Sequence, residues 1–184
     1  MSGINITGGI ASGRKITEVF GKTRPTPARL RRALFDIIGD IEGVCFVDLF
    51  AGSGAVGIEA LSRGADKAIF VELEHRSCRA IEKNIGAVSL GDADYQIVCR
   101  DALIWMKHST FQNKTIIFAS PPYIKEFLPE VIEAFDGLFR KYTGLDILLI
   151  LQFPKREWRK CPISEPSRIH AVGDDLLLFW ECAE

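Results

Sequence analysis

The chain has 184 residues, of which 47% are hydrophobic and 26% are charged, and its net charge is −1 at pH 7. This length suffices for one domain with a substantial core and is too short for two full domains. No apolar run approaches the roughly 20 residues that span a bilayer, and no basic segment followed by an apolar core begins the chain. We therefore expect a cytoplasmic protein with no membrane partner.

The cysteines and histidines favour a reduced protein without a metal. The five cysteines are odd in number, widely spaced and set mostly in apolar runs, which is typical of small hydrophobic side chains in a reducing compartment. The three histidines are isolated, and their spacing from the cysteines suggests no metal site. We expect no metal, and we expect a monomer.

Charge is distributed unevenly along the chain. Residues 1–40 contain seven Lys or Arg and three Asp or Glu, whereas the rest of the chain carries 16 basic and 21 acidic residues. This asymmetry indicates a basic N-terminal extension, residues 1–40, on an acidic domain, residues 41–184. The basic extension could bind nucleic-acid phosphates. The alternative is that its charged side chains only form the solvent-exposed face of a helix. The side chains expected to contact phosphate are Arg14, Lys15, Lys22, Arg24, Arg29 and Arg32.

The extension predicts two local structures. The glycine-rich residues 4–20 suit a β-hairpin or loose strands. A helix should follow, with Thr26 as its N-cap, Pro27 in its first turn and Gly39 at its end. Apolar residues at helical spacing would turn one stripe of this helix towards the core, namely Leu30, Ala33, Leu34, Ile37 and Ile38.

The stretch 44–61 is the central unit of the chain. Its first four residues, Val44 to Val47, are apolar and suit a strand buried on both faces. Gly52-Ser-Gly54 breaks this run, and residues compatible with a helix follow. Strand, glycine turn and helix form the first unit of a doubly wound α/β sheet, in which backbone N–H groups and a helix N-terminus face a ligand.

Two nucleotide cofactors fit this unit. Gly52-Ser-Gly-Ala-Val-Gly57 matches the pattern G-x-G-x-x-G, and Glu72, about twenty residues further on, could bind a ribose hydroxyl, which alone favours NAD. Asp48 at the strand end, however, would repel a pyrophosphate and attract the cationic sulfonium and ammonium groups of S-adenosylmethionine. The pattern favours S-adenosylmethionine over NAD. A loop that only packs the helix on the strand is the remaining alternative.

Strands and helices alternate from residue 44 to residue 153. Further strands are predicted at 68–72, 95–99, 115–119 and 145–153, and helices at 75–86, from about 101 to 106, and at 125–141, with Gly86 as a helix stop. Strands at 167–172 and 175–180 would form a terminal hairpin. The fold class is therefore α/β: a Rossmann-like, seven-stranded, mostly parallel sheet that ends in an antiparallel hairpin.

Polar residues follow the first four strands, at the carboxyl ends where parallel sheets bind ligands. Asp48, Glu72, Asp101 and Ser120 should therefore meet at one rim, with Glu72 accepting from ribose hydroxyls and Asp101 from the adenine amino group. Each acid alone could be an ordinary surface residue at a strand end. The predicted cofactor contacts, among which Phe50, Leu73 and Ala102 would line the adenosine, are Asp48, Phe50, Gly52, Gly54, Glu72, Leu73, Asp101 and Ala102.

The second specific motif is the run Ser120, Pro121, Pro122 and Tyr123. Its two prolines fix a stiff turn, and its tyrosine offers a flat face on which a base can stack. A backbone carbonyl and a side-chain acceptor beside it could hold an exocyclic amine and stabilise the charge that develops there. These four are the candidate catalytic residues, and the alternative is a structural Pro-Pro turn with a packed aromatic ring.

These motifs resemble those of known families. Asp48-Leu-Phe-Ala-Gly-Ser-Gly54 resembles the first motif of class I methyltransferases. Ser120-Pro-Pro-Tyr123 is similar to the Asn/Asp-Pro-Pro-Phe/Tyr motif of methyltransferases that act on the exocyclic amines of bases. With Gly13-Arg-Lys15, Lys22-Thr-Arg-Pro-Thr26 and Glu59-Ala-Leu-Ser-Arg-Gly64 added, the chain is similar to the RsmD-type family over most of residues 6–125.

The resemblance implies a class I methyltransferase fold and an enzyme that uses S-adenosyl-L-methionine to methylate a guanine exocyclic amine in bacterial small-subunit rRNA. The partner would be that rRNA or an assembling ribosomal particle. The chain departs from the family at Ser120, where the family has Asp, and at Gln152, where an acid is expected. A serine hydroxyl still accepts a hydrogen bond but stabilises a developing cation less. Two alternatives remain: the same chemistry on another nucleic acid, and a ribosome assembly factor that binds S-adenosylmethionine and RNA with weak or no catalysis.

Overall fold

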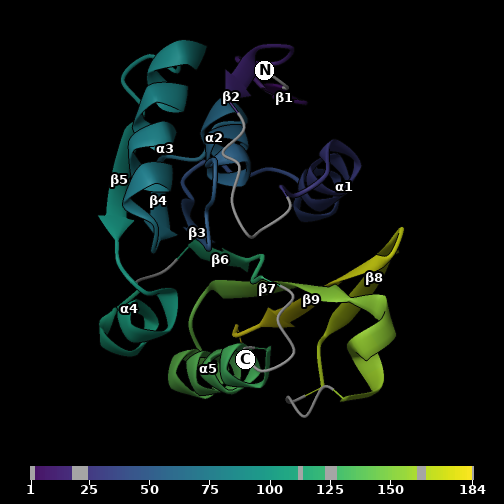
Figure 1. The fold of residues 1–184 in the computed structure, drawn as a ribbon. Helices are drawn as coiled ribbons and strands as arrows, with labels where there is room; N and C mark the ends of the chain where they lie inside the picture. The colour runs from purple at the N-terminus through teal and green to yellow at the C-terminus, as the bar shows by residue number, and fades with distance from the viewer. Residues whose placement is uncertain (1–2, 18–24, 112–113, 123–127, 161–164, 184) are drawn as a thin grey trace.

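The computed structural model describes residues 3–17, 25–111, 114–122, 128–160 and 165–183 (Figure 1). A central seven-stranded sheet has the order β5-β4-β3-β6-β7-β9-β8. The first five of these strands are parallel, and β9 pairs antiparallel with both β7 and β8. The strands are β3 (Cys45–Leu49), β4 (Lys67–Glu72), β5 (Asp94–Cys99), β6 (Thr115–Ala119), β7 (Ile147–Pro154), β8 (Arg168–Val172) and β9 (Asp175–Glu181). The α/β fold with a terminal antiparallel hairpin is as predicted.

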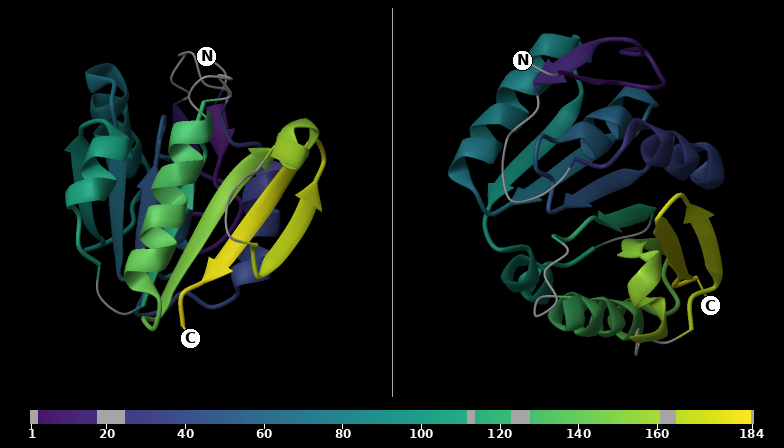
Figure 2. Two further views of the ribbon diagram at one scale, coloured as in Figure 1. Left: turned by 90° about the horizontal axis from the view of Figure 1, so that it is seen from below. Right: turned by 45° about the vertical axis from the view of Figure 1, so that its right-hand side comes forward.

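Helices cover both faces of the sheet (Figures 1 and 2). One face carries α1 (Ala28–Ile38), α2 (Ala55–Ser62) and α3 (His75–Val88), and the other carries α4 (Ala102–His108) and α5 (Leu128–Tyr142). A 3-10 helix, η1 (Lys155–Lys160), follows β7. The central strands β3, β6 and β7 are almost entirely buried, because apolar side chains from both of their faces enter the cores. Among the helices of the described ranges, none combines the length and apolar character of a membrane span.

The N-terminal extension packs on the face of α2 and α3. Its hairpin pairs β1 (Gly3–Asn5) with β2 (Lys15–Thr17) as a separate antiparallel sheet, as predicted. Ile6 and Ile16 are buried in one cluster with α2 and α3, and the side chain of Asn84 on α3 bonds both backbone groups of Thr17. The boundary at residue 40 stays a prediction.

Two local predictions are wrong. Gly86 does not end its helix, since α3 continues to Val88 and Ser89 ends it with a φ of 51°. Thr26 does not cap α1, because Pro27 occupies the N-cap position without a side-chain bond and the Thr26 hydroxyl contacts Ser120 and Gln152 instead. Gly39 does close α1, with a φ of 73° and its N–H bonded to the Phe35 carbonyl.

Candidate active site

The loop between β3 and α2 is held in an unusual backbone conformation. Gly52 and Gly54 have φ values of 56° and 77°, which suit glycine, but Phe50 has a φ of 61°. A large side chain in this region costs about 1–3 kcal/mol and marks functional loops. Gly57 has a different reason, since a Cβ there would lie 2.3 Å from the Phe70 ring. The glycines thus shape the loop and let α2 pack closely on the sheet.

Asp48 lies beneath this loop at the end of β3. Its side chain is 2% exposed, and its Oδ2 accepts a hydrogen bond from the Gly57 N–H at 2.9 Å. Burial raises the pKa of Asp48 to about 8, although the Gly57 hydrogen bond lowers it, and Glu72 raises it further. The carboxyl is therefore largely neutral at pH 7, and a cation placed beside it would favour its charged form.

Two further strand-end acids lie at the same edge of the sheet. Glu72 accepts from the Gly52 N–H at 2.7 Å and from the Glu74 N–H at 3.0 Å, so it ties the end of β4 to the glycine loop. Asp101 caps α4 by accepting from the Ile104 N–H at 2.9 Å, a role that was not predicted. Leu73 beside Glu72 is 60% exposed, whereas Ala102 is buried.

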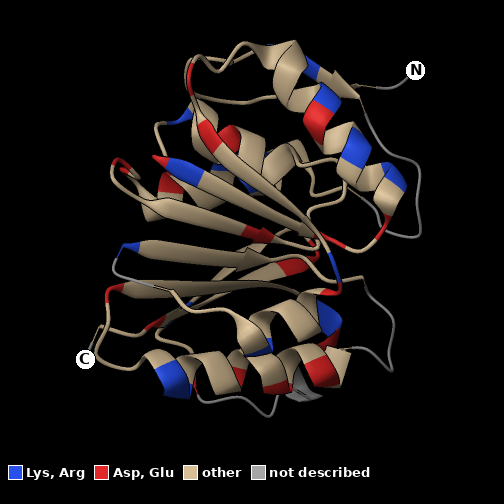
Figure 3. Cartoon of the chain, turned by 90° about the vertical axis from the view of Figure 1, so that its left-hand side faces the viewer, with Lys and Arg blue, Asp and Glu red and all other residues tan. Residues whose placement is uncertain are grey.

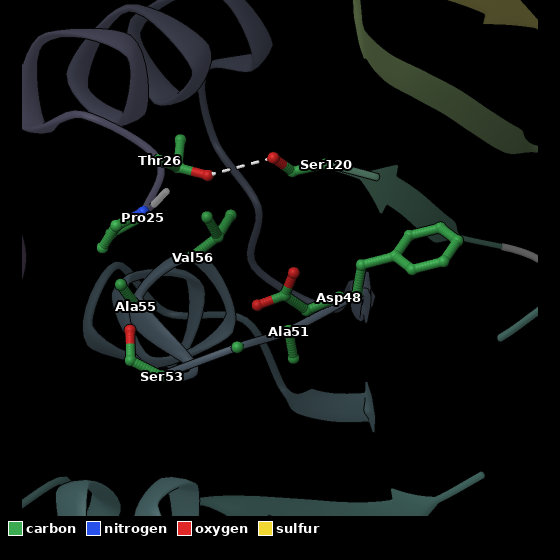
Figure 4. A pocket seen from close by; sticks show the side chains of 10 residues that line it. Pro25, Thr26, Asp48, Ala51, Ser53, Ala55, Val56 and Ser120 are labelled. Carbon is green, nitrogen blue, oxygen red and sulfur yellow. Dashed lines mark hydrogen bonds between the residues drawn. The ribbon is translucent and has the colours of Figure 1, made fainter. Parts of the chain in front are cut away.

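A pocket joins the glycine loop to the start of the Pro-Pro motif (Figure 4). Asp48, Phe50, Gly52 and Ser120 line it together with Pro25 and Thr26 of the N-terminal extension. The Thr26 hydroxyl lies 3.4 Å from the Ser120 Oγ, which donates to Gln152 Oε1 at 2.9 Å. Thr26 was not predicted to line the pocket, and the only sequence signal for Gln152 was its departure from the family pattern.

The motif that begins with Ser120 lies directly after β6. The Ser120 N–H donates to the Leu49 carbonyl at 3.4 Å, which holds the motif against the end of β3. Pro121 is buried, and Ser120 and Pro122 are half-buried. The expectation for Tyr123 lies outside the described residues.

The predicted phosphate contacts fall into two groups. Arg14 and Lys15 are exposed on the N-terminal hairpin, and Arg29 and Arg32 are exposed on α1. Figure 3 shows the side of the molecule that carries α3, away from α1, where basic and acidic residues are mixed. The Arg29 guanidinium lies close over Gly173 in the β8–β9 turn, where a Cβ would be 2.1 Å from its Nη2. The expectations for Lys22 and Arg24 lie outside the described residues.

One arginine of α1 has a different environment. Arg31 is 1% exposed, and its Nε lies 3.1 Å from Oε2 of Glu59, itself fully buried on α2. Its Nη1 and Nη2 donate to the carbonyls of Thr26 and Asn5, each at 2.6 Å. Arg63 and Thr7 also bond the Glu59 carboxylate. This buried ionic cluster fixes the extension on α2 and sets the position of Thr26 in the pocket.

The sheet order reverses between β3 and β6, and the pocket lies at this switch point, where open α/β sheets bind ligands. A glycine loop after the central strand, acids at the next strand ends and a final antiparallel hairpin define a class I methyltransferase fold. The buried Asp48 carboxyl, the Glu72 carboxylate on the glycine loop and the open face of Gly52 suit S-adenosyl-L-methionine.

Comparisons with known proteins agree with this fold. Residues 4–147 match the model of the family described as Conserved hypothetical protein 95. The Ribosomal RNA small subunit methyltransferase D of Buchnera aphidicola is 32% identical, over 85% of this chain and 81% of its own length. The chain belongs to this family, and the RsmD-type resemblance of its motifs is confirmed. It is accordingly a methyltransferase.

Solved structures extend the comparison to the whole fold. A hypothetical protein of Thermus thermophilus is 28% identical, with a TM-score of 0.74 over 97% of this chain and 99% of that one. An RNA methyltransferase from Salinibacter ruber, solved in complex with S-adenosyl-L-homocysteine, has a TM-score of 0.58 over 88% of this chain and 95% of its own. It is only 15% identical, so it supports the fold alone.

Proposed function

We propose that this protein transfers the methyl group of S-adenosyl-L-methionine to the exocyclic amine of a guanine in bacterial small-subunit rRNA. The observation that carries the proposal is the pocket in which the Ser120 hydroxyl faces the same space as the glycine loop and Asp48. This arrangement supports a site in which the amine acceptor lies beside the cofactor. The name of the Buchnera relative supports small-subunit rRNA as the substrate, in the cytosol where ribosomes assemble.

The cofactor would lie along the glycine loop. Gly52 lines the pocket and leaves room for it, and Asp48 would balance its cationic end. Gly54 would contribute by shaping the loop, since a Cβ there would meet Ile81 at 3.2 Å. Glu72 would accept from the ribose hydroxyls and Asp101 from the adenine amino group. The apolar contacts would come from Phe50 and the exposed Leu73, with Ala102 behind them. When bound, the cofactor supplies a methyl carbon on a sulfonium, which is electrophilic enough to react with a neutral amine.

The chain's own residues would then orient the amine. The Ser120 oxygen and a backbone carbonyl of the motif would accept its two N–H groups, which aims the nitrogen lone pair away from them. Pro121 and Pro122 would keep these acceptors in place, and Tyr123 would stack on the base. As the nitrogen–carbon bond forms and the carbon–sulfur bond breaks, the nitrogen would become positive and both acceptors would stabilise it. The surplus N–H proton would then pass to solvent, which leaves a neutral methylated amine and S-adenosyl-L-homocysteine.

The substrate RNA would lie across the basic extension. Arg14, Lys15, Arg29 and Arg32 offer exposed charges to phosphate, and we place Lys22 and Arg24 in the same role. These contacts position the RNA without reading its sequence.

Mass mapping of modified nucleosides in rRNA from a strain without this gene tests the proposal. We expect one N2-methylguanosine of the small-subunit rRNA to disappear and to return with the wild-type gene. An unchanged modification pattern would refute the assignment. Slowed small-subunit assembly with unchanged modification would instead favour an assembly factor. This is the second candidate function because Ser120 stands where the family has an acid.

A further inference from the structure

Gln152 is a buried amide beside the catalytic motif. The register of β6 and β7 pairs Ala119 with Leu151, so Gln152 follows at the level of Ser120. Leu151 and Phe153 on either side are fully buried, and Gln152 itself is 3% exposed. A buried amide needs hydrogen-bond partners, because desolvation without them costs about 1–3 kcal/mol. An otherwise apolar strand therefore carries a polar side chain where it meets the pocket.

Two hydroxyls that line the pocket contact the oxygen of this amide. Ser120 Oγ donates to Gln152 Oε1 at 2.9 Å, and Thr26 Oγ1 lies 3.4 Å from the same oxygen and 3.4 Å from Ser120 Oγ. The close contact between Ser120 and Gln152 is thus the strong one. Figure 4 shows that the Thr26 and Ser120 hydroxyls point toward each other from different elements.

The direction of this hydrogen bond decides what Ser120 can do. An amide oxygen only accepts, and a serine hydroxyl has one proton and two lone pairs. Once the proton is committed to Gln152, Ser120 meets the pocket as an acceptor, and at least one lone pair remains even if Thr26 donates to it. An amide turned the other way would occupy a lone pair and direct the proton of Ser120 at the incoming N–H groups.

We propose that Gln152 is a positioning residue that makes the Ser120 oxygen an acceptor for the amine of the methylated base. The inference rests on the proposed function and explains how a serine serves there. A neutral amide also suits this place, because an acid would add a second buried carboxyl to a pocket that already contains Asp48. Thr26 brings the N-terminal extension into the same arrangement.

Gln152→Leu tests the proposal, because leucine keeps much of the volume and removes the acceptor. With the cognate RNA we expect kcat to fall about 10–100-fold, with the KM for RNA and the affinity for S-adenosyl-L-homocysteine within about twofold of wild type. Tyr142→Phe is the control, since it removes a buried hydroxyl bonded to Ser109 and Phe111, outside the pocket. It should lose stability and keep kcat.

A double variant distinguishes a role of Gln152 in positioning Ser120 from a general loss of protein stability. On a Ser120→Ala background, Gln152→Leu should lower kcat no further, because it acts only through the hydroxyl. An unchanged kcat in the single variant, or an equal loss on both backgrounds, would overturn the proposal.

A readout without turnover keeps the proposal separate from the function. In NMR spectra of isotope-labelled protein, Ser120→Ala should move the side-chain carbonyl carbon signal of Gln152 more than Thr26→Val does. If that signal stays and only the Gln152 amide protons move, the amide donates to Ser120 and the proposal is wrong. If the wild-type protein methylates no RNA, and Ser120→Ala still moves the Gln152 carbonyl signal, the proposed function is refuted. The direction of the hydrogen bond is then supported all the same.

Discussion

Two buried polar clusters meet at Thr26 and use opposite chemistry. Behind the pocket, the ionic cluster joins Arg31, Glu59 and Arg63, and Arg31 donates to the Thr26 carbonyl at 2.6 Å. Facing the pocket, the neutral cluster joins the Thr26 hydroxyl to Ser120 and Gln152. One residue thus belongs to both, with its carbonyl on the ionic side and its hydroxyl on the neutral side.

The difference indicates what each cluster is for. Charges are buried behind the pocket where several fixed partners satisfy them, which gives one geometry and no freedom to bind anything else. Inside the pocket the groups are neutral hydroxyls, an amide and a carboxyl whose pKa burial raises to about 8. Charge brought by the cofactor or formed on the amine would then meet dipoles that are already oriented.

Arg31→Met should break the ionic cluster and have the largest effect. It leaves the buried Glu59 without its fully buried partner and frees the carbonyls of Thr26 and Asn5, so we expect a loss of about 3–5 kcal/mol in the free energy of unfolding. Urea unfolding measures the loss, and hydrogen exchange should show the N-terminal hairpin less protected. Arg32→Met, the next residue on α1 but exposed, is the control and should change stability by at most about 0.5 kcal/mol. Equal effects of the two variants would contradict the structural role of Arg31.

Glu72→Ala should act on the cofactor side of the pocket. Losing charge-assisted hydrogen bonds to ribose should weaken the binding of S-adenosyl-L-homocysteine by about 1–3 kcal/mol in calorimetry. Glu82→Ala, an exposed acid on α3, is the matched control and should bind like wild type. Measurable NAD binding by the wild type, or unchanged affinity in Glu72→Ala, would speak against the cofactor assignment.

The order of strands and helices could be predicted from sequence because it depends on local patterns. Apolar runs, glycine turns and amphipathic stretches predicted all seven strands of the main sheet, with shifts of a few residues at their ends. Gly86 failed as a helix stop because a glycine ends a helix only where the chain must turn, and α3 continues to pack through Ile85 and Val88. Helix ends thus depend on contacts that the local pattern does not contain.

The residues that complete the pocket could not be predicted for a related reason. Arg31 meets Glu59 across 28 positions of the chain, Thr26 meets Ser120 across 94 and Gln152 across 126. Thr26 was expected to cap α1 because threonine is favoured before a helix. Its hydroxyl instead contacts Ser120 and Gln152, which are distant in sequence. The strand-end rule brought Asp48 and Ser120 together correctly because it follows from sheet topology.

Asp48→Asn tests whether the buried Asp48 carboxyl is neutral in the folded protein. The native protein retains the Asp48 proton until a pH of about 8, whereas the unfolded chain releases it near the ordinary value of 3.8. The native state therefore binds more protons between these values, and stability falls as the pH rises, by up to about 1.4 kcal/mol per pH unit. Asparagine cannot ionise, so this part of the slope should vanish in urea unfolding from about pH 5 to pH 8. A slope identical to that of wild type would mean that Asp48 is charged throughout.

The smallest effect is expected at Arg32, and it separates the two neighbouring arginines of α1. Arg31 is buried and paired with Glu59, whereas Arg32 is exposed and can reach phosphate. Each lost phosphate contact reduces the slope of log affinity against log salt by about 0.7–0.9, because fewer counterions are released. Arg32→Ala should reduce the slope by about this amount in RNA-binding titrations, while S-adenosyl-L-homocysteine binds as before. Lys67→Ala is the control, because Lys67 begins β4 at the opposite end of the strand from Glu72 and pairs with Asp94. If both variants change the slope equally, the charge of α1 acts only through the net charge of the protein; if only Arg32→Ala changes it, the helix that anchors the extension through Arg31 also presents the RNA contact.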